Sequence, residues 1–455
     1  MATGENTMNG SYLNVIDQIY NASWTANKLS RFSLLQEAMQ ALLPHQPKAK
    51  TLKYIQVVGT SGKGSTTRFL EAGLNTVSSA GSLTSPHVFD YRERFSVAGQ
   101  MPTRPQVTEI WEKKILAYMV AQAEAGQPAL SFTELTILIA LHVFTKAKVE
   151  WAVMEAALGG RYDQTQALQP QFSVLTNVGD DHRDFLGEHL WQRALDKGGI
   201  IQEGRQFFTS ETALETVEIL QNLCREQKTA YIDVSASEVA ATKRALQKLL
   251  SPQALQQTLF ATDIQYRNAA LALKVITSIY PEADETRILT AFTRVRIIGR
   301  FQKIAPNIYI DIAHNPNKIV ALADTLQAHF PKQKKIFVLG FSRGKNIADM
   351  LKPLLPQAQK IFVATEFYKS EDAATVKKAL KAAVKRTSIT FIEDPKQALR
   401  AAQEFLDLRR VQGAGEDTPL ILTGSTYMIA AATNPDPYLE YINTLNDWRD
   451  PQQHR

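Results

Sequence analysis

A glycine-rich segment between an apolar strand and a helical pattern constrains this chain more than any other feature. It reads Gly59-Thr60-Ser61-Gly62-Lys63-Gly64-Ser65-Thr66 and follows the β-branched run at residues 54–58. Glycines let backbone N–H groups surround a phosphate, the helix N-terminus adds a favourable dipole, and Lys63 adds a positive charge. Ser65 or Thr66 can reach a magnesium ion from such a loop. The segment therefore predicts a nucleotide site, although its spacing differs from the usual G-x-x-x-x-G-K-[ST] form; the alternative is a glycine-rich turn that holds a lysine by chance.

The composition of the 455 residues, 44% hydrophobic and 21% charged, is that of an ordinary folded protein. The length predicts two or three domains. Cys224 is the single cysteine, which excludes an intramolecular disulfide and a cysteine-rich zinc site and favours a reducing, cytoplasmic setting. The net charge of +6 is spread along the chain, which favours anionic small molecules as partners and disfavours nucleic acid.

No targeting or membrane segment is expected. The first residues have neither a basic nor an apolar region of the kind that a secretory signal needs. The longest strongly apolar stretch, residues 135–144, is too short to span a bilayer. We therefore expect a cytoplasmic protein that has no membrane partner.

Apolar segments of strand length divide the chain into two halves. In the first half they occupy residues 54–58, 151–154 and 172–176; residues 12–43 are predicted as amphipathic helices and 44–50 as a polar connection. In the second half, such segments begin at 308, 335, 360, 389 and 419, with helical patterns such as 372–384 and 395–408 between them. This alternation predicts βα units on a parallel sheet. We place the boundary so that the domains are 1–298 and 299–455.

Further short motifs follow the glycine-rich segment in order. They are Thr84-Ser85-Pro86-His87 with Arg92-Glu93-Arg94, Met154-Glu155 with LGGRYD at 158–163, GDDHRDFLG at 179–187, DKGGI at 196–200, Gln265 with Asn268-Ala269-Ala270, Gly299-Arg300, DIAHNP at 311–316 and TGS at 423–425. As an ordered set over nearly the whole chain they resemble the Mur ligase superfamily, and within it the folylpolyglutamate synthase/dihydrofolate synthase family. The resemblance implies an α/β fold with an N-terminal P-loop-type ATP-binding domain on a parallel sheet and a smaller C-terminal Rossmann-like domain.

The resemblance also implies the chemistry and the residues that perform it. ATP would convert a carboxylic acid into an acyl phosphate, which the amine of an amino acid attacks, while cations stabilise the transferred phosphoryl group. Lys63, His182, Lys197 and Arg300 are expected to be catalytic. ATP is expected to contact Gly59, Thr60, Ser61, Gly62, Lys63, Gly64, Ser65, Thr66, Asn268, Arg300, Asp311 and His314. Two magnesium sites are expected, with ligands drawn from Ser65, Ser85, Glu155 and His182.

Several of these residues also have simpler interpretations. Glu155 could be a solvated carboxylate at a strand end, His182 a structural histidine, and Asn268 a helix cap. Lys197 matches the lysine that carbon dioxide carbamylates in the superfamily, which would turn a cation into an anion that helps to orient magnesium. The alternative for Lys197 is an ordinary surface lysine in a helix.

The residues expected to contact the acid substrate depart in part from the family pattern. These residues are Thr133, Arg161, Asp163 and Gln164. Thr133 lies in Phe132-Thr133-Glu134, where the family has Y-F-E, and Gln164 stands where the family has a small residue near the pterin. The D-K-D motif is replaced by RGKN at 343–346, which removes two carboxylates.

Three functions are open at this point. The first is a folylpolyglutamate or dihydrofolate synthase that adds L-glutamate to a folate or pteroate in one-carbon metabolism. The second is a ligase of the same fold that couples an amino acid to a non-folate carboxylic acid in specialised metabolism. The third is a catalytically silent nucleotide-binding protein, which the joint presence of Lys63, Glu155, His182, Lys197 and Arg300 disfavours. We expect a monomer whose partners are small molecules.

Overall fold

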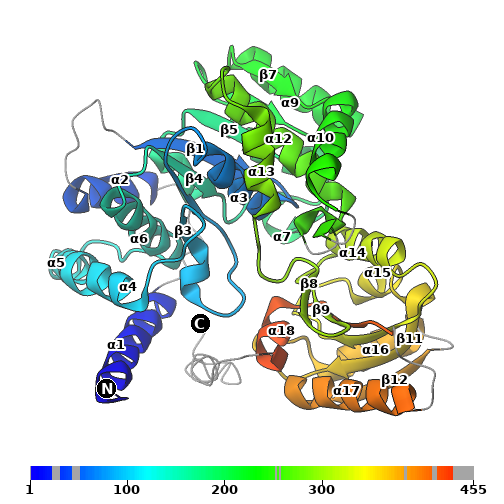
Figure 1. Ribbon diagram of the computed structural model, residues 1–455. Coiled ribbons are helices and arrows are strands. Elements are labelled where there is room, and N and C mark those ends of the chain that lie inside the picture. Colours follow the sequence, from blue (N-terminus) through cyan, green and yellow to red (C-terminus); the bar gives the residue numbers. More distant parts are fainter. Residues whose placement is uncertain are drawn as a thin grey trace. The chain divides into compact units, whose positions relative to one another are not determined.

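The computed structural model of the chain describes residues 2–22, 31–43, 52–251, 254–255, 258–383, 387–411 and 418–433 (Figure 1). The chain divides into two compact units. Unit 1 contains residues 1–87, 91–252 and 264–295, and unit 2 contains residues 88–90, 253–263 and 296–455. The main division thus falls between residues 295 and 296, and two short segments of the first half belong to unit 2. The predicted connection at 44–50 lies outside the described residues.

Unit 1 is built on a sheet of seven strands in the order β3-β2-β4-β1-β5-β6-β7. The strands are β1 Lys53–Val58, β2 Ala80–Leu83, β3 Phe95–Val97, β4 Trp151–Glu155, β5 Phe172–Leu175, β6 Gln206–Thr209 and β7 Ala230–Asp233. All neighbours are parallel except β3, which is antiparallel to β2 at the edge. Because β1 lies between β4 and β5, the glycine-rich segment leaves the sheet at its centre, between the ends of two parallel neighbours.

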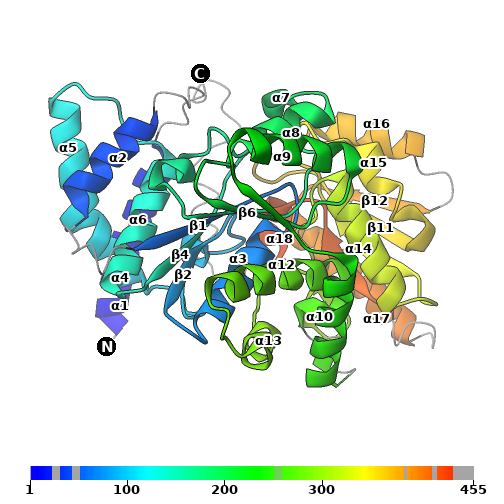
Figure 2. The same ribbon diagram turned by 90° about the horizontal axis from the view of Figure 1, so that it is seen from above.

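Helices cover both faces of this sheet. Their bounds are α1 Ala2–Tyr20, α2 Arg31–Leu42, α3 Lys63–Leu74, α4 Arg104–Ile110, α5 Leu116–Glu124, α6 Phe132–Lys146, α7 Arg183–Leu186, α8 Leu190–Gly198, α9 Leu214–Glu226, α10 Ala236–Leu249, α12 Asp263–Ile279 and α13 Glu285–Thr293. Figure 2 shows α3, α10, α12 and α13 on one face and α8 and α9 on the other. Among the described residues, no helix has both the length and the apolar character needed to cross a membrane.

Unit 2 contains a second sheet, with six strands in the order β12-β11-β10-β13-β9-β8. The strands are β8 Gln302–Ala305, β9 Ile308–Ile310, β10 Lys335–Leu339, β11 Ala358–Ala364, β12 Ser388–Ile392 and β13 Leu420–Thr423, and the helices are α14 Pro316–His329, α15 Ile347–Leu351, α16 Ala373–Ala383, α17 Pro395–Val411 and α18 Thr426–Thr433. Only β8 is antiparallel to its neighbour. Apolar residues of α14, α15 and α16 pack on one face and those of α17 and α18 on the other. The predicted α/β fold with parallel sheets is confirmed.

Candidate active site

The glycine-rich segment forms a tight loop between β1 and α3. Gly59 has φ +147° and Gly62, the N-cap of α3, has φ +83°. A Cβ atom at Gly59 would lie 1.9 Å from Thr176 Oγ1, and a Cβ atom at Gly62 would lie 2.5 Å from Asn268 Oδ1. The positive φ angles and these close neighbours both require glycine. Asn268, on α12, therefore lies beside Gly62, the last residue of the loop before α3.

Two residues that follow β5 hold the backbone of this loop. Ser61 O accepts hydrogen bonds from Thr176 Oγ1 (2.6 Å) and Asn177 Nδ2 (3.2 Å), while Ser61 N donates to Asn177 Oδ1 (3.0 Å). Thr60 N donates to the carbonyl oxygen of Asn177 at 3.0 Å. Sequence reasoning missed Thr176 and Asn177, although the carboxyl end of a strand next to β1 is where ligand-binding loops of such sheets meet.

The loop has donors that suit a phosphate. Lys63 is the first residue of α3, and its Nζ turns back to donate to Gly59 O at 2.8 Å. Ser61 Oγ and Thr66 Oγ1 are buried and have no hydrogen-bond partner in the described part of the chain. Buried hydroxyls without a partner are rare, so each of them calls for an explanation. An anion bound at the N-terminus of α3 would provide one.

Glu155, the last residue of β4, lies against the first turn of α3. It is 5% exposed, its Oε2 accepts a hydrogen bond from Ser85 N at 2.8 Å, and a Cβ atom at Gly64 would lie 3.2 Å from that oxygen. The structure therefore excludes the interpretation of Glu155 as a solvated strand-end carboxylate. It brings together three of the four residues predicted as magnesium ligands, because Ser65 follows Gly64 directly and Ser85 holds Glu155.

The side chain of His182 is more exposed than that of Glu155. Its backbone is left-handed with φ +54°, its side chain is 42% exposed, and its Nε2 lies 3.7 Å from Asp181 Oδ2. The described residues contain no cluster of three or more histidine, cysteine or acidic side chains that could hold a metal ion. A magnesium ion at Glu155 would thus need hydroxyl, water and phosphate oxygens as well, which is the coordination that this ion prefers beside nucleotides.

Lys197, on α8, is buried in unit 1 and is only 4% exposed. Its pKa is lowered to about 7: burial is the largest cause, the positive charge of Lys63 acts in the same direction, and Asp196, Asp181 and Asp163 oppose the shift. The structure thus excludes an ordinary surface lysine and places Lys197 within electrostatic reach of the lysine of the phosphate loop. Strongly shifted pKa values of this kind are typical of functional sites.

The residues predicted to contact the acid substrate differ in their surroundings. Asp163 is buried, and its carboxylate accepts four hydrogen bonds, from Ala157 N (2.9 Å), Leu158 N (3.1 Å), and Thr165 N (3.0 Å) and Oγ1 (2.6 Å). These bonds occupy the carboxylate, so it shapes the turn after β4.

The other three predicted substrate residues lie on two elements and a turn. Gln164 is 7% exposed and begins the short 3-10 helix Gln164–Leu168. Arg161 is exposed in the turn before it, and Thr133 is partly buried in the first turn of α6.

Unit 2 contains the remaining predicted ATP contacts at the carboxyl end of β9. The Asp311 carboxylate accepts hydrogen bonds from Phe301 N (2.8 Å) and Ala313 N (2.9 Å). Burial raises the pKa of Asp311, while Arg300 and these backbone bonds oppose the rise. Arg300 and Asp311 are therefore electrostatic neighbours within unit 2.

His314 follows in the same loop. Its Nδ1 lies 2.8 Å from Ile312 O, and because a carbonyl can only accept, Nδ1 carries the proton. Its Nε2 lies 3.2 Å from Lys318 Nζ, which must then be the donor. His314 is thus neutral in this arrangement, with one tautomer selected by its neighbours.

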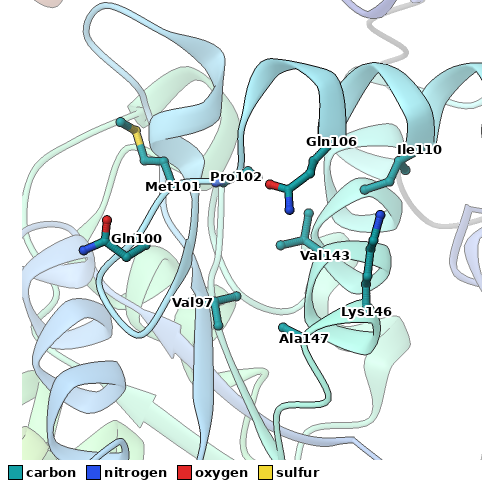
Figure 3. A pocket seen from close by; sticks show the side chains of 9 residues that line it. All are labelled: Val97, Gln100, Met101, Pro102, Gln106, Ile110, Val143, Lys146 and Ala147. Carbon is teal, nitrogen blue, oxygen red and sulfur yellow. The ribbon is translucent and has the colours of Figure 1, made fainter.

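A separate pocket of about 250 Å³ lies elsewhere in unit 1 (Figure 3). It is lined by Val97, Gln100, Met101, Pro102, Gln106, Ile110, Val143, Lys146 and Ala147. Val97 pairs with Gly81 near the start of β2, and Ala147 follows α6 ahead of β4. The pocket therefore lies at the amino ends of β2 and β4, whereas the phosphate loop and Glu155 lie at the carboxyl ends.

Comparisons with known proteins agree with the motifs. Residues 299–414 match the glutamate ligase domain of Mur ligases. The chain is 26% identical over 401 residues to the dihydrofolate synthase/folylpolyglutamate synthase of Bacillus subtilis, which covers 84% of this chain and 90% of that protein. The chain is therefore similar to this synthase along most of its length. A similar enzyme of Mycobacterium tuberculosis is 28% identical over 379 residues, which are 77% of this chain and 76% of that protein.

Solved structures of such synthases share the fold. The folylpolyglutamate synthase of Mycobacterium tuberculosis complexed with ADP matches with a TM-score of 0.80 and 23% identity, over 94% of this chain and 99% of that one. The bifunctional synthase of Yersinia pestis complexed with AMPPNP and a manganese ion matches with a TM-score of 0.71 and 22% identity, over 92% and 96%. The resemblance drawn from the motifs is confirmed.

Proposed function

We propose that this chain is an ATP-dependent ligase that phosphorylates the carboxylate of a folate or pteroate and joins it to the amine of L-glutamate, with release of ADP. The homology to dihydrofolate synthase/folylpolyglutamate synthases supports this function. The observation that carries it is the arrangement of three functional groups at the phosphate loop: Lys63 begins α3, Glu155 lies against the first turn of that helix, and Lys197 is within electrostatic reach of Lys63.

ATP is proposed to bind with its phosphates on the loop at 59–66 and its base beside Asn268. Ser61 Oγ, Thr66 Oγ1 and the backbone N–H groups at the start of α3 provide donors, and Lys63 would exchange Gly59 O for phosphate oxygens. Bound magnesium would neutralise charge on the phosphates. Glu155, positioned by Ser85 N, is the residue that fits it best, with Ser65 and His182 as the other proposed ligands.

Lys197 is proposed to be carbamylated. A neutral amine is needed for attack on carbon dioxide, and the pKa of about 7 leaves a large neutral fraction at physiological pH. The carbamate would be an anion, so the positive charge of Lys63 would stabilise it. The same positive charge destabilises the protonated form of Lys197.

Unit 2 is proposed to act as the C-terminal ligase domain, with Arg300, Asp311 and His314 contacting ATP. The match of residues 299–414 to a glutamate ligase domain supports this assignment. We further propose that the protein works in the cytoplasm as a monomer, with small molecules as its partners.

One observation favours the second candidate, a ligase for a non-folate acid. Gln164 is 7% exposed, and its amide has no hydrogen bond to any described residue. The amide atoms are not among the fully buried atoms without a partner, so solvent reaches them, and a polar group of the acid substrate would be a natural partner for the amide. Gln164→Ala should improve the use of pteroate if the protein is a folate enzyme with an altered pocket, and impair it if the amide holds the pterin.

The test is ADP and phosphate release by the purified chain with pteroate, tetrahydrofolate and unrelated carboxylic acids, each with glutamate or another amino acid as acceptor. We expect release to require acid and ATP, and oxygen-18 in the acid carboxylate to appear in inorganic phosphate. AMP as the product, or label that stays wholly in the amide, would refute the acyl-phosphate route. A non-folate acid that exceeds every pteroate and folate would favour the second candidate.

A further inference from the structure

Arg94, at the end of the 3-10 turn Tyr91–Arg94, is held firmly on one side. Its Nε donates to His87 Nδ1 at 2.8 Å. Its guanidinium carbon lies 5.1 Å from the ring centroid of Phe132 and 5.8 Å from that of Tyr91, both of which are buried. Cation–π contacts of this kind fix a guanidinium plane while they leave its N–H edge available.

A second contact orients the histidine that holds Arg94. Because Arg94 Nε can only donate, His87 Nδ1 must be the acceptor, and the proton of the neutral ring is therefore on Nε2. That Nε2 lies 2.6 Å from the hydroxyl of Tyr20, which comes from α1. Tyr20, His87 and Arg94 thus form a chain of hydrogen bonds that ends in the guanidinium.

The terminal nitrogens of Arg94 are not used by the described residues. They make no hydrogen bond or ion pair there, and they are not among the fully buried atoms without a partner, so solvent reaches them. Arg68, on α3, shows the contrast: its two terminal nitrogens bond to Glu71, Ser82 Oγ, Thr84 Oγ1 and Glu93 O. Arg68 is a structural arginine, whereas Arg94 presents a fixed fork of donors that has no partner among the residues that the structure describes.

The backbone places Arg94 beside the proposed metal ligand. Thr84 N donates to Arg94 O at 2.8 Å, and the next residue, Ser85, holds Glu155 through its own N–H. Arg94 is thus tied through its backbone to Thr84 and through its side chain to His87, which are the two ends of the segment 84–87 that also positions Glu155. The phosphates already have Lys63 and the N-terminus of α3. Among the residues described above for the acid, Arg161 is the one cation, and it is exposed in the turn before Gln164, whereas Arg94 is held in place by His87 and two aromatic rings.

We propose that Arg94 binds the carboxylate of the acid substrate through its terminal nitrogens, and that Tyr20 and His87 are positioning residues that orient it. The proposal rests on the proposed ligase function. A guanidinium fork matches a carboxylate in a bidentate pair, and its preorganisation by His87 and the two aromatic rings reduces the entropy lost on binding.

The test compares pteroate with its methyl ester, which lacks the charge, by equilibrium dialysis without nucleotide. We expect wild-type protein to bind the acid about ten- to a hundredfold more tightly than the ester, which is the usual range for a charge-assisted bidentate pair. Arg94→Gln should abolish that preference, and Arg94→Lys should restore only part of it. Tyr20→Phe should weaken the acid about threefold without changing the ester. Arg225→Gln, on the exposed side of α9, is the matched control and should bind like wild type.

Three results would overturn the proposal. They are equal binding of the acid and the ester by wild-type protein, no binding of pteroate, and a preference for the acid that survives in Arg94→Gln. A loss of AMPPNP affinity without a loss of pteroate affinity would assign Arg94 to the phosphates and overturn it as well. These results are distinct from a failure of the proposed function, which would appear as wild-type protein that forms no ADP in response to any acid.

Discussion

Carbamylation of Lys197 is the prediction that the structure makes most quantitative. An unperturbed lysine, with a pKa near 10.4, has roughly four neutral amines in ten thousand at pH 7. The pKa of Lys197, which burial and the charge of Lys63 lower to about 7, makes about half of the amines neutral. The fraction able to attack carbon dioxide is thus about a thousandfold larger than for an unperturbed lysine.

The assay is removal and return of carbon dioxide. Protein prepared in bicarbonate-free buffer at pH 7 should lose acid-dependent ADP formation and regain it when bicarbonate is added. Carbon-13 bicarbonate should give one carbamate resonance in wild-type protein that is missing from Lys197→Arg. Lys197→Ala should be inactive and should recover partly with a short carboxylate such as propionate. Activity that ignores carbon dioxide, together with a resonance that survives in Lys197→Arg, would refute the reasoning.

The same burial predicts how stability depends on pH. Between about pH 7 and pH 10 the lysine is protonated in the unfolded chain and neutral in the folded one, so the unfolded state binds more protons and stability rises with pH. A shift of about three units is worth on the order of 4 kcal/mol in the absence of carbamylation. Lys197→Met should therefore raise Tm at pH 7 in bicarbonate-free buffer, with a gain that shrinks toward pH 10. A lower Tm for the variant at pH 7 would contradict the pKa shift.

Three further predictions concern the loop and its support. Lys63→Ala should abolish ATP-dependent ligation while circular dichroism stays unchanged, since the hydrogen bond of the Lys63 ammonium within the described residues goes to the loop backbone at Gly59 O. Unchanged turnover would refute the interpretation of a phosphate loop. Gly62→Ala should lower the free energy of unfolding by about 1–2 kcal/mol, because φ at this position is +83°. It should also weaken AMPPNP binding in calorimetry, because the new methyl group would meet Asn268. Binding of AMPPNP with the wild-type affinity would contradict this prediction. Glu71→Gln should lower the urea midpoint by an amount equivalent to about 2–3 kcal/mol of stability. The buried Glu71 carboxylate accepts hydrogen bonds from Arg68, Ser82, Ser96 and the backbone N–H of Gly99. A urea midpoint equal to that of wild type would contradict this prediction.

Apolar runs predicted the strands that are rich in large hydrophobic residues well, and strands of small or polar residues poorly. β10 (KIFVL) is found at the predicted residues 335–339, and β12 (SITFI) begins one residue before its predicted start, because both contain several large apolar residues between polar turns. β2 (AGSL) and β8 (QKIA) were not predicted. β2 is short and built mostly from small residues, while β8 is an edge strand that begins with Gln302 and Lys303, so neither has the composition of a continuous apolar strand.

The candidate site could be predicted where a single segment of the sequence contains both the glycines that the backbone conformation requires and the side chains that would bind the ligand. The loop at 59–66 met that condition, and the motif with Lys197 was found by resemblance. Thr176, Asn177 and Tyr20 could not be found in this way because their roles arise from contacts across the fold. Tyr20, for example, meets His87 at a distance of 67 residues along the chain, and no local pattern records that pairing.

The structure also explains why the loop departs from the usual spacing, in which lysine is followed directly by serine or threonine. Here Gly64 separates Lys63 from Ser65, and a Cβ atom at position 64 would lie 3.2 Å from Glu155 Oε2, closer than most side chains tolerate. Any larger residue would push the carboxylate away from α3 and from Ser85 N, which holds it at 2.8 Å. Gly64 and the buried Glu155 are therefore linked. Because position 64 has no side chain, the carboxylate of Glu155 on β4 can lie against α3, the helix whose N-terminus is proposed to bind the phosphates.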